Sequence, residues 1–341
     1  MAASAVTTLA IALAVIALWG VWTYFGAGPA ARHGPSTTVV LRHGASLPEI
    51  ASDLEDQGVV RSGSVFVAAA QITGAARRLK AGEYAFPSRA TLAQVVEMIR
   101  EGRIVRHFVT IPEGLTSAQA VAILMASPVL TGQVSTPAEG SLLPETYEVE
   151  RGTDRNVVLH RMTAARERLL AGLWPNRRPG LPFRTPEEAV TLASIVEKET
   201  ALPNERPRVA AVFVNRLEKS IPLASDPTIV YGLTRGLPLG HGIRQSELAS
   251  VTPYNTYHFT GLPPTPICNP GRASIAAALD PAQTDDLYFV ANGAGGHSFS
   301  ATMAEHEKNV ERWRQVEHQR ATSPAAAAQP GPLRGEVSNG R

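Results

Sequence analysis

The sequence predicts an α+β protein with an apolar N-terminal helix, a small α+β module and a larger α+β domain. Short strand-like runs are followed by a glycine turn and a helix start, and Pro- and Gly-rich loops separate these units. The 341 residues are 44% hydrophobic, enough for a sizeable core. We place the boundaries at 1–31 (apolar segment and flank), 32–37 (linker), 38–104 (small module), 105–318 (larger domain) and 319–341 (tail).

Residues 1–31 contain no charged side chain, and residues 7–25 are almost entirely apolar. Roughly 20 apolar residues span a bilayer as a helix, and Trp22 and Tyr24 lie where an interfacial aromatic belt would fall. We therefore expect a retained transmembrane anchor that contacts the lipid bilayer through residues 7–25. A cleaved secretory signal is the alternative.

The small module contains two helix starts of the capping-box type, Ser46 with Glu49 and Thr91 with Gln94. Strands are predicted at 38–41 and 82–87, and glycines at 58 and 102 mark the helix ends. Residues 108–119 repeat the strand, glycine turn and capping box at an offset of 70 residues. Duplication and the ordinary chemistry of a strand-to-helix turn explain this repeat equally well.

In the larger domain, residues 185–200 show the strongest helix pattern, with Thr185 as N-cap, Pro186 at the first position and a predicted end at Pro203. At about 100° per residue, Glu199 shares the apolar face of Leu192, Ile195 and Val196, whereas Glu197 lies about 160° around the axis. A carboxyl group on a buried face has a raised pKa and can act as a general acid. A solvated charge at a fraying helix end is the alternative. Farther on, the sequence predicts a strand at 286–291 and a polar helix from about Thr302 through Trp313, followed by a disordered Ala- and Pro-rich tail.

Composition and missing motifs exclude several functions. Lys and Arg total 32 against 30 Asp and Glu, a net charge of +2, so no nucleic-acid partner is expected. Cys268 is the single cysteine, and the nine histidines lack metal-ligand spacing, so no metal or other cofactor is expected. The sequence contains no P-loop, no Gly-x-Ser-x-Gly and no His-Glu-x-x-His. Carboxylate chemistry at Glu199 remains.

Other polar and aromatic residues are candidate substrate contacts, each with an ordinary structural alternative such as a turn, a cap or packing. These candidates are Glu197, Asn215, Asp226, Thr228, Tyr231, Tyr254, Asn255, Tyr257 and His297.

Five motifs occur in a recognisable order: 192–200 (LASIVEKET), 225–232 (SDPTIVYG), 253–257 (PYNTY), 261–271 (GLPPTPICNPG) and 287–299, which ends in GGHSF. In this order and spacing the chain resembles the endolytic murein transglycosylases, the MltG or YceG-like family, over residues 37–318.

The resemblance implies a single-pass protein of the cell inner membrane, with a LysM-like small module and a periplasmic YceG-like catalytic domain. It implies cleavage of the MurNAc-β-1,4-GlcNAc bond within nascent peptidoglycan strands to leave 1,6-anhydroMurNAc ends. Glu199 would be the catalytic acid and base, and Asp226, Tyr254, Asn255 and Tyr257 would line the cleft. Termination of strand growth and contact with peptidoglycan synthases are further expectations.

Two rival functions remain open. One is a non-catalytic, glycan-binding wall protein, which needs aromatic platforms but no acidic Glu199. The other is a hydrolytic muramidase, which needs a second carboxylate, with Asp226 the natural candidate.

Overall fold

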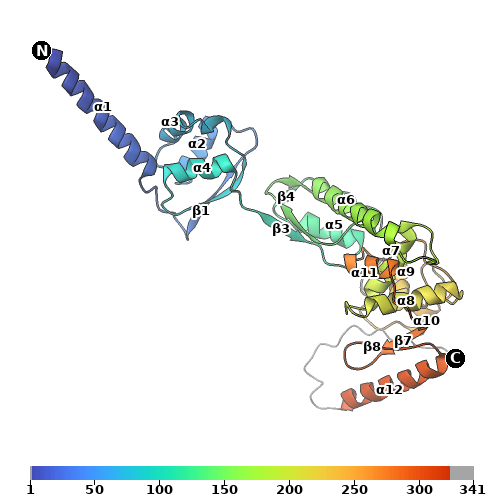
Figure 1. Ribbon diagram of the computed structural model, residues 1–341. Helices are drawn as coiled ribbons and strands as arrows, with labels where there is room; N and C mark the ends of the chain where they lie inside the picture. Colours follow the sequence, from blue (N-terminus) through green and yellow to red (C-terminus); the bar gives the residue numbers. More distant parts are fainter. Residues whose placement is uncertain (1, 323–341) are drawn as a thin grey trace. The chain divides into compact units, whose positions relative to one another are not determined.

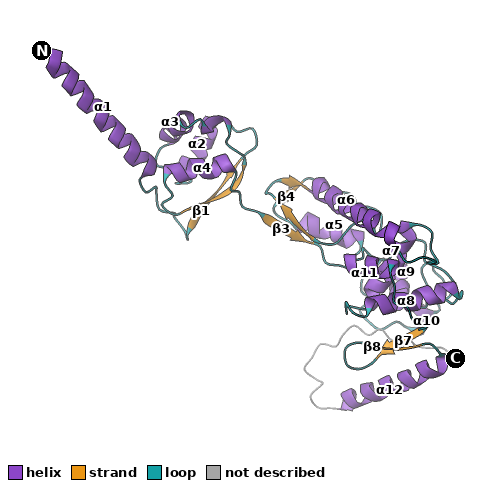
Figure 2. Ribbon diagram, viewed as in Figure 1, coloured by secondary structure: helices purple, strands orange, loops and turns teal. Residues whose placement is uncertain are grey.

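The computed structural model describes residues 2–322, and they form two compact units (Figure 1). The first unit comprises Met1–Phe108 and Glu148–Thr153, and the second comprises Val109–Tyr147 and Asp154–Arg341. Helices and short two-stranded sheets alternate in both, so the α+β prediction is confirmed (Figure 2). The predicted tail begins inside the last helix, and its residues 323–341 lie outside the described part of the chain.

The first unit is built on one antiparallel strand pair, in which Val39 lies opposite Tyr84. Both capping boxes form, with Ser46 and Thr91 each accepting from the third backbone N–H of its helix. The buried side chains of these helices and of the strand pair form one core around Leu54, Phe66 and Ile99. The elements are α1 (Ala2–Phe25), β1 (Ser36–Leu41), α2 (Leu47–Asp56), α3 (Gly63–Ile72), a 3₁₀ turn (Ala75–Arg77), β2 (Gly82–Pro87) and α4 (Leu92–Glu101).

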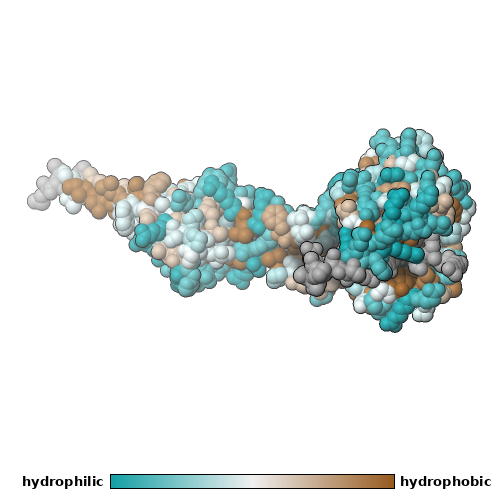
Figure 3. Space-filling view, turned by 90° about the horizontal axis from the view of Figure 1, so that it is seen from below, coloured by the Kyte–Doolittle hydropathy of each residue, from teal (hydrophilic) through white to brown (hydrophobic). Residues whose placement is uncertain are grey.

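The N-terminal helix α1 forms as predicted, and its large apolar side chains are exposed, among them Leu18 and Trp22. Figure 3 shows brown, hydrophobic surface along this helix. None of the helices in the described residues combines the length and the apolar character that a membrane span requires. Beyond the helix, Gly28 N donates to Arg89 O and Arg89 N donates to Pro29 O, so residues 28–29 are hydrogen-bonded to the turn after β2.

The second unit is mainly helical. The remaining strands of the described residues pair as β3 with β5, β4 with β6, and β7 with β8, the last pair antiparallel with Phe289 opposite Phe299. The strands are β3 (His107–Thr110), β4 (Leu130–Thr131), β5 (Thr146–Val149), β6 (Thr153–Asp154), β7 (Tyr288–Ala291) and β8 (His297–Ser300). The helices are α5 (Ser117–Ala126), α6 (Arg155–Leu173), a 3₁₀ turn (Trp174–Asn176), α7 (Pro186–Glu199), α8 (Arg206–Glu218), α9 (Asp226–Thr234), α10 (Gln245–Leu248), α11 (Arg272–Leu279) and α12 (Met303–Thr322).

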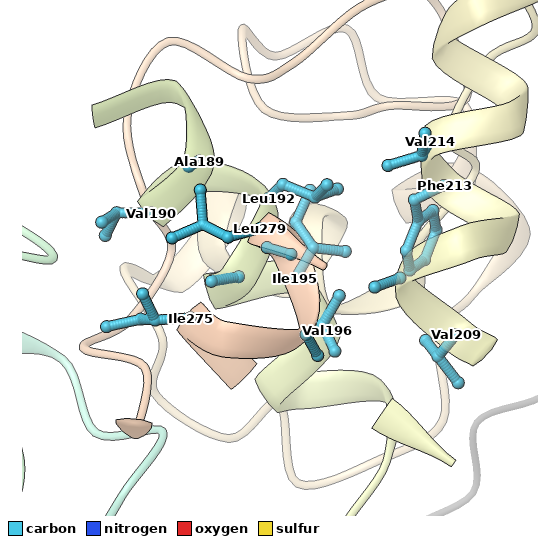
Figure 4. Close-up of a cluster of buried hydrophobic side chains, with 14 of the residues drawn as sticks. Ala189, Val190, Leu192, Ile195, Val196, Val209, Phe213, Val214, Ile275 and Leu279 are labelled. Atoms are coloured by element: carbon cyan, nitrogen blue, oxygen red, sulfur yellow. The ribbon is translucent and has the colours of Figure 1, made fainter. Parts of the chain in front are cut away.

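Helix α7 is the centre of the second unit's core. Its capping box forms, with Thr185 Oγ1 accepting from Glu188 N at 3.2 Å. All eight residues from Ala189 to Val196 are buried, because α8 and α11 pack on different sides of the helix (Figure 4). Because the middle of α7 is buried on all sides, the packed helix fixes where its last turn begins.

Two predicted helix ends differ from the structure. Helix α7 ends at Glu199 rather than at Pro203, because Thr200 already has an extended backbone (φ −142°, ψ 133°). Helix α12 continues past Trp313 to Thr322. Because α7 ends earlier than predicted, Glu199 is its last residue.

Candidate active site

Glu199 is the last residue of α7, and its side chain is partly buried. The Ser225 hydroxyl donates to its Oε1 at 2.5 Å. Because Oε1 accepts this bond, Oε2 is the oxygen on which an acidic proton would be carried. The carboxyl group is therefore held from one side by a residue 26 positions farther along the chain.

Burial, with a smaller contribution from the charge of Asp226, raises the pKa of Glu199 to about 7. The hydrogen bond from Ser225 and the charge of Arg216 act in the opposite direction but are outweighed. A carboxyl group with this pKa holds a proton on about half of the molecules at neutral pH. It can therefore donate a proton in one step and accept one in the next.

Ser225 is itself fixed by buried threonines of two segments. Its backbone N–H donates to Thr256 Oγ1 at 3.0 Å, and its carbonyl accepts from Thr228 Oγ1 at 2.6 Å. The preceding residue, Ala224, has φ 47°, in the left-handed region that residues with a Cβ rarely adopt. Its N–H donates to Thr256 O at 3.0 Å. Thr228, one of the candidates predicted from the sequence, thus holds Ser225 in place rather than facing Glu199 itself.

Asp226 and Tyr257 form the second layer of the site. The Tyr257 hydroxyl donates to Asp226 Oδ1 at 2.7 Å. Burial and the neighbouring Asp226 carboxylate raise the pKa of Tyr257, so it stays a neutral donor. Asn255 is fully buried, with its Oδ1 accepting from Tyr257 N and its amide donating to Leu248 O and Ser250 O. Asn255 therefore orders the loop that presents Tyr257.

Arg216 is a site residue that is absent from the predicted substrate contacts, although it directly follows the candidate Asn215. Its Nε donates to Leu287 O at 2.7 Å and its Nη1 to Leu223 O at 2.8 Å, and its guanidinium lies 5.3 Å from the Tyr288 ring centroid. It joins the segment before Ser225 to the segment before β7, and its charge acts on Glu199. In the sequence, the feature that could have indicated Arg216 is its position just after the apolar run 209–214 of α8. The side-chain amide of its neighbour Asn215 donates hydrogen bonds to Thr284 O at 2.8 Å and to Asp286 O at 2.9 Å.

Two predicted tyrosines lie in an enclosed aromatic pair. The rings of Tyr231 and Tyr254 meet edge to face at 4.8 Å, and each residue is less than a tenth exposed. The Tyr231 hydroxyl donates to Glu139 Oε2 at 3.3 Å, and the Tyr254 hydroxyl bonds Thr265 Oγ1 at 2.9 Å. Their rings are packed against protein rather than presented to a ligand.

Glu197 and His297 are positioned by other partners. Glu197 Oε2 accepts from Gly271 N at 2.9 Å, and Arg206 Nη2 lies 3.7 Å from its Oε1. His297 Nδ1 lies 2.7 Å from Glu205 Oε2, which also accepts from Thr200 Oγ1 at 3.4 Å. His297 thus reaches the residue after Glu199 through Glu205. Nowhere in residues 2–322 do three or more His, Cys, Asp or Glu side chains gather as metal ligands would.

The carboxyl group of Glu199, which has a pKa of about 7, thus has four residues around it: Ser225, Asp226, Tyr257 and Arg216. The arrangement provides a single residue able to act as acid and base, with a second carboxylate beside it. Of the sequence-predicted residues, Glu199, Asp226 and Tyr257 are brought together, and Thr228 and Asn255 support them.

Comparison with known proteins gives consistent matches. The YceG-like family matches residues 39–312. The endolytic murein transglycosylase of Streptococcus pneumoniae serotype 2 (strain D39) is 28% identical over 322 residues, which cover 80% of this chain and 57% of that protein. The enzyme of the same name from Bacillus subtilis (strain 168) is 27% identical over 311 residues, covering 82% of this chain and 85% of that protein.

A solved crystal structure of a yceG-like protein from Listeria monocytogenes is also similar. It is 30% identical with a TM-score of 0.50, and the match covers 80% of this chain and 98% of that one. The chain spans 57% of the length of the pneumococcal relative. Because the family match runs through the segments that carry Glu199, Ser225, Asp226 and Tyr257, the site belongs to the matched region, and the chain belongs to the YceG-like family.

Proposed function

We propose that this chain is an endolytic murein transglycosylase, a lyase that cleaves the MurNAc-β-1,4-GlcNAc bond within peptidoglycan strands. The observation that carries the proposal is the Glu199 carboxyl group, whose pKa of about 7 suits both proton donation and proton abstraction. The names of the relatives support the substrate class.

The reaction follows from one carboxyl group acting twice. Glu199 Oε2 gives its proton to the glycosidic oxygen as the bond from that oxygen to C1 of MurNAc breaks. The Glu199 carboxylate then takes the proton of the same sugar's C6 hydroxyl, and O6 bonds to C1 as the 1,6-anhydro ring closes. The proton lost in the first step is regained in the second, and no water is consumed. Ser225 keeps Oε1 occupied throughout, and the Asp226 carboxylate stabilises the positive charge that develops at C1.

A hydrolytic muramidase is the second candidate, and one observation favours it. Asp226 is near enough to Glu199 to raise its pKa, so a second carboxylate is available to activate a water molecule or to attack C1. The two candidates differ in the product end. A non-catalytic wall-binding protein is the third candidate and predicts no product.

The deciding experiment incubates the full chain in detergent with uncrosslinked glycan strands and reads the product ends by mass spectrometry. Anhydro ends, about one water lighter than hydrolysed ends, support the transglycosylase. Reducing ends support the muramidase, and glycan retention without cleavage supports the binding protein. The Glu199→Gln variant should abolish cleavage while remaining folded. Glu218→Gln, the same substitution at an exposed carboxylate on α8, is the matched control and should leave cleavage unchanged.

We further propose that α1 anchors the chain in the cell inner membrane, with the second unit on the periplasmic face. The exposed apolar side chains of α1 support this, although none of the described helices meets the requirement for a span. Within this proposal, residues 38–104 are a LysM-like glycan-binding module, and the enzyme cuts nascent strands near peptidoglycan synthases and so terminates their growth. Alkaline carbonate extraction tests the anchor: the full chain should stay with the membranes, and its release would contradict the anchor.

A further inference from the structure

A cavity of about 360 Å³ lies between the β7–β8 hairpin and α12, which pack against each other (Figure 2). Its volume falls in the range of small-ligand sites. None of the candidate site residues lines it. Its lining residues are Asp286, Phe299, Ser300, Ala301, Glu305, Lys308, Asn309 and Arg312.

One wall of the cavity carries a buried hydroxyl group without a partner. Ser300 is 5% exposed, and over residues 2–322 its Oγ has no hydrogen-bond partner. Its carbonyl is used, because it accepts from Leu287 N at 2.9 Å. Burying a hydroxyl group that makes no hydrogen bond costs free energy, so a ligand oxygen at this position would be favoured.

The acidic side chains of the cavity already have partners within the protein. Asp286 accepts from Arg208 Nε at 2.6 Å and from Arg208 Nη2 at 3.3 Å. Glu305 Oε2 accepts from Thr302 N at 3.3 Å, as the carboxylate of a cap at the start of α12. The Asp286 carboxylate is therefore ion-paired with Arg208, and the Glu305 carboxylate is directed to the backbone at the start of α12.

The basic side chains, by contrast, still have donors to offer. Lys308 and Arg312 are four residues apart on α12, and so lie on one face of the helix. Arg312 Nη1 donates to Asn309 Oδ1 at 3.3 Å, which uses only one of the guanidinium donors. In the described part of the chain no acceptor bonds Lys308 Nζ. The donors that the cavity can offer to a ligand thus come from two cations and one hydroxyl, which together favour a carboxylate.

An apolar wall and a link to the catalytic carboxyl group complete the cavity. Phe299 lines it, with the Arg208 guanidinium 4.4 Å from the ring centroid. The Arg216 side chain, which acts on Glu199, donates to the carbonyl of Leu287 next to Asp286. The segment before β7, which lines the cavity with Asp286, is therefore hydrogen-bonded to an arginine that acts on Glu199.

We propose that this cavity is a subsite for the carboxylate-bearing peptide attached to the muramic acid residues of the glycan strand. Arg312 and Lys308 bind the carboxylate, the Ser300 hydroxyl donates to it, and Phe299 covers an apolar part of the peptide. The inference deepens the proposed function and rests on it. It predicts that the enzyme prefers peptide-bearing strands to strands stripped of peptide.

The test compares KM for peptide-bearing strands with KM for strands stripped by an amidase, using the full chain in detergent. Arg312→Ala should raise the KM ratio of peptide-bearing to stripped strands about tenfold, the loss of one charge-assisted hydrogen bond. Arg314→Ala removes the same charge from the same helix at an exposed residue outside the cavity, and should leave the ratio unchanged. An unchanged ratio in Arg312→Ala overturns the subsite.

A second measurement separates the subsite from the chemistry. Calorimetry with the tripeptide L-alanyl-γ-D-glutamyl-L-lysine should give binding to the Glu199→Gln variant, which cannot cleave, and none with the fully amidated peptide. Ser300→Ala should weaken this binding without lowering the melting temperature, since its hydroxyl has no partner within the protein. Cleavage without peptide binding would refute the subsite and leave the proposed function standing. Peptide binding by a parent protein that does not cleave glycan would support the subsite and refute the proposed function.

Discussion

At the scale of single residues, the acidity of Glu199 is a balance among its neighbours. Burial and Asp226 raise its pKa, and Ser225 and Arg216 lower it. Four elements contribute: α7 carries Glu199, α8 carries Arg216, Asp226 begins α9, and the loop after α10 supplies Tyr257. The position of Glu199 on the apolar face of its helix was predictable from spacing. Its partners were not, because 26 residues separate it from Ser225 and only packing joins them.

Removing the Ser225 hydroxyl should change both the rate and its pH dependence. Ser225→Ala loses the bond that lowers the pKa of Glu199, so the alkaline limb of kcat/KM should move to higher pH. It also frees the carboxyl group to rotate, and kcat should fall about tenfold, the worth of one hydrogen bond to a charged group. Ser225→Thr keeps the hydroxyl and should restore most of both properties. A profile identical to that of the parent would contradict this role.

The raised pKa of Glu199 should also appear in the stability of the fold. In the unfolded chain the group loses its proton near pH 4.5, whereas in the folded chain it does so near pH 7. The folded state therefore binds more protons in this window, and stability falls as pH rises through it, by up to about 3 kcal/mol.

Glu199→Gln removes this titration. The variant should match the parent in melting temperature near pH 4 and exceed it near pH 8, as measured by calorimetry. Glu218→Gln, at an exposed carboxylate, should follow the parent at both pH values. A constant difference between Glu199→Gln and the parent at the two pH values would show that the group is not buried as described.

At the scale of elements, the helix starts were the most predictable features. The capping boxes of α2, α4, α5 and α7 form from residues three positions apart, so the sequence contains the whole interaction. Helix α3 escaped prediction, since its N-cap Ser62 makes no side-chain cap bond and its first residue is Gly63. Helix α7 was expected to have one apolar face, but contacts with α8 and α11 bury it all round.

The cap of α7 should contribute measurably to stability. Thr185→Ala removes the acceptor of Glu188 N and should cost about 1 kcal/mol of unfolding free energy. Thr185→Ser keeps the hydroxyl oxygen, and its unfolding free energy should fall by no more than a few tenths of a kcal/mol. Urea unfolding followed by circular dichroism measures both, and equal losses in the two variants would contradict the capping role.

At the scale of the whole molecule, all the residues around Glu199 belong to the second unit, and α1 belongs to the first. The buried residues of the first unit's core all lie outside α1, of which Tyr24 packs against that core. The proposed anchor and the proposed active site therefore lie in different units of the chain.

A chain that begins at residue 27 should accordingly cleave soluble glycan with the kcat/KM of the full chain in detergent. It keeps residues 28–29, which are hydrogen-bonded to the turn after β2. Turnover of the two proteins, with their folding compared by circular dichroism, checks this. A folded but inactive truncated chain would mean that α1 contributes to catalysis.

The sequence by itself determined what depends on near neighbours: the α+β class, the capped helices, the apolar first helix and the placement of Glu199 on a buried face. Its ordered motifs also indicated the family. Tertiary structure decided which distant groups meet: Ser225 and Arg216 at Glu199, Asn255 under Tyr257, the enclosure of Tyr231 and Tyr254, and the cavity beside α12. The division has a physical cause. Capping and helix periodicity act within one or two turns, whereas desolvation and hydrogen bonds at a site arise only when segments far apart in sequence are packed together.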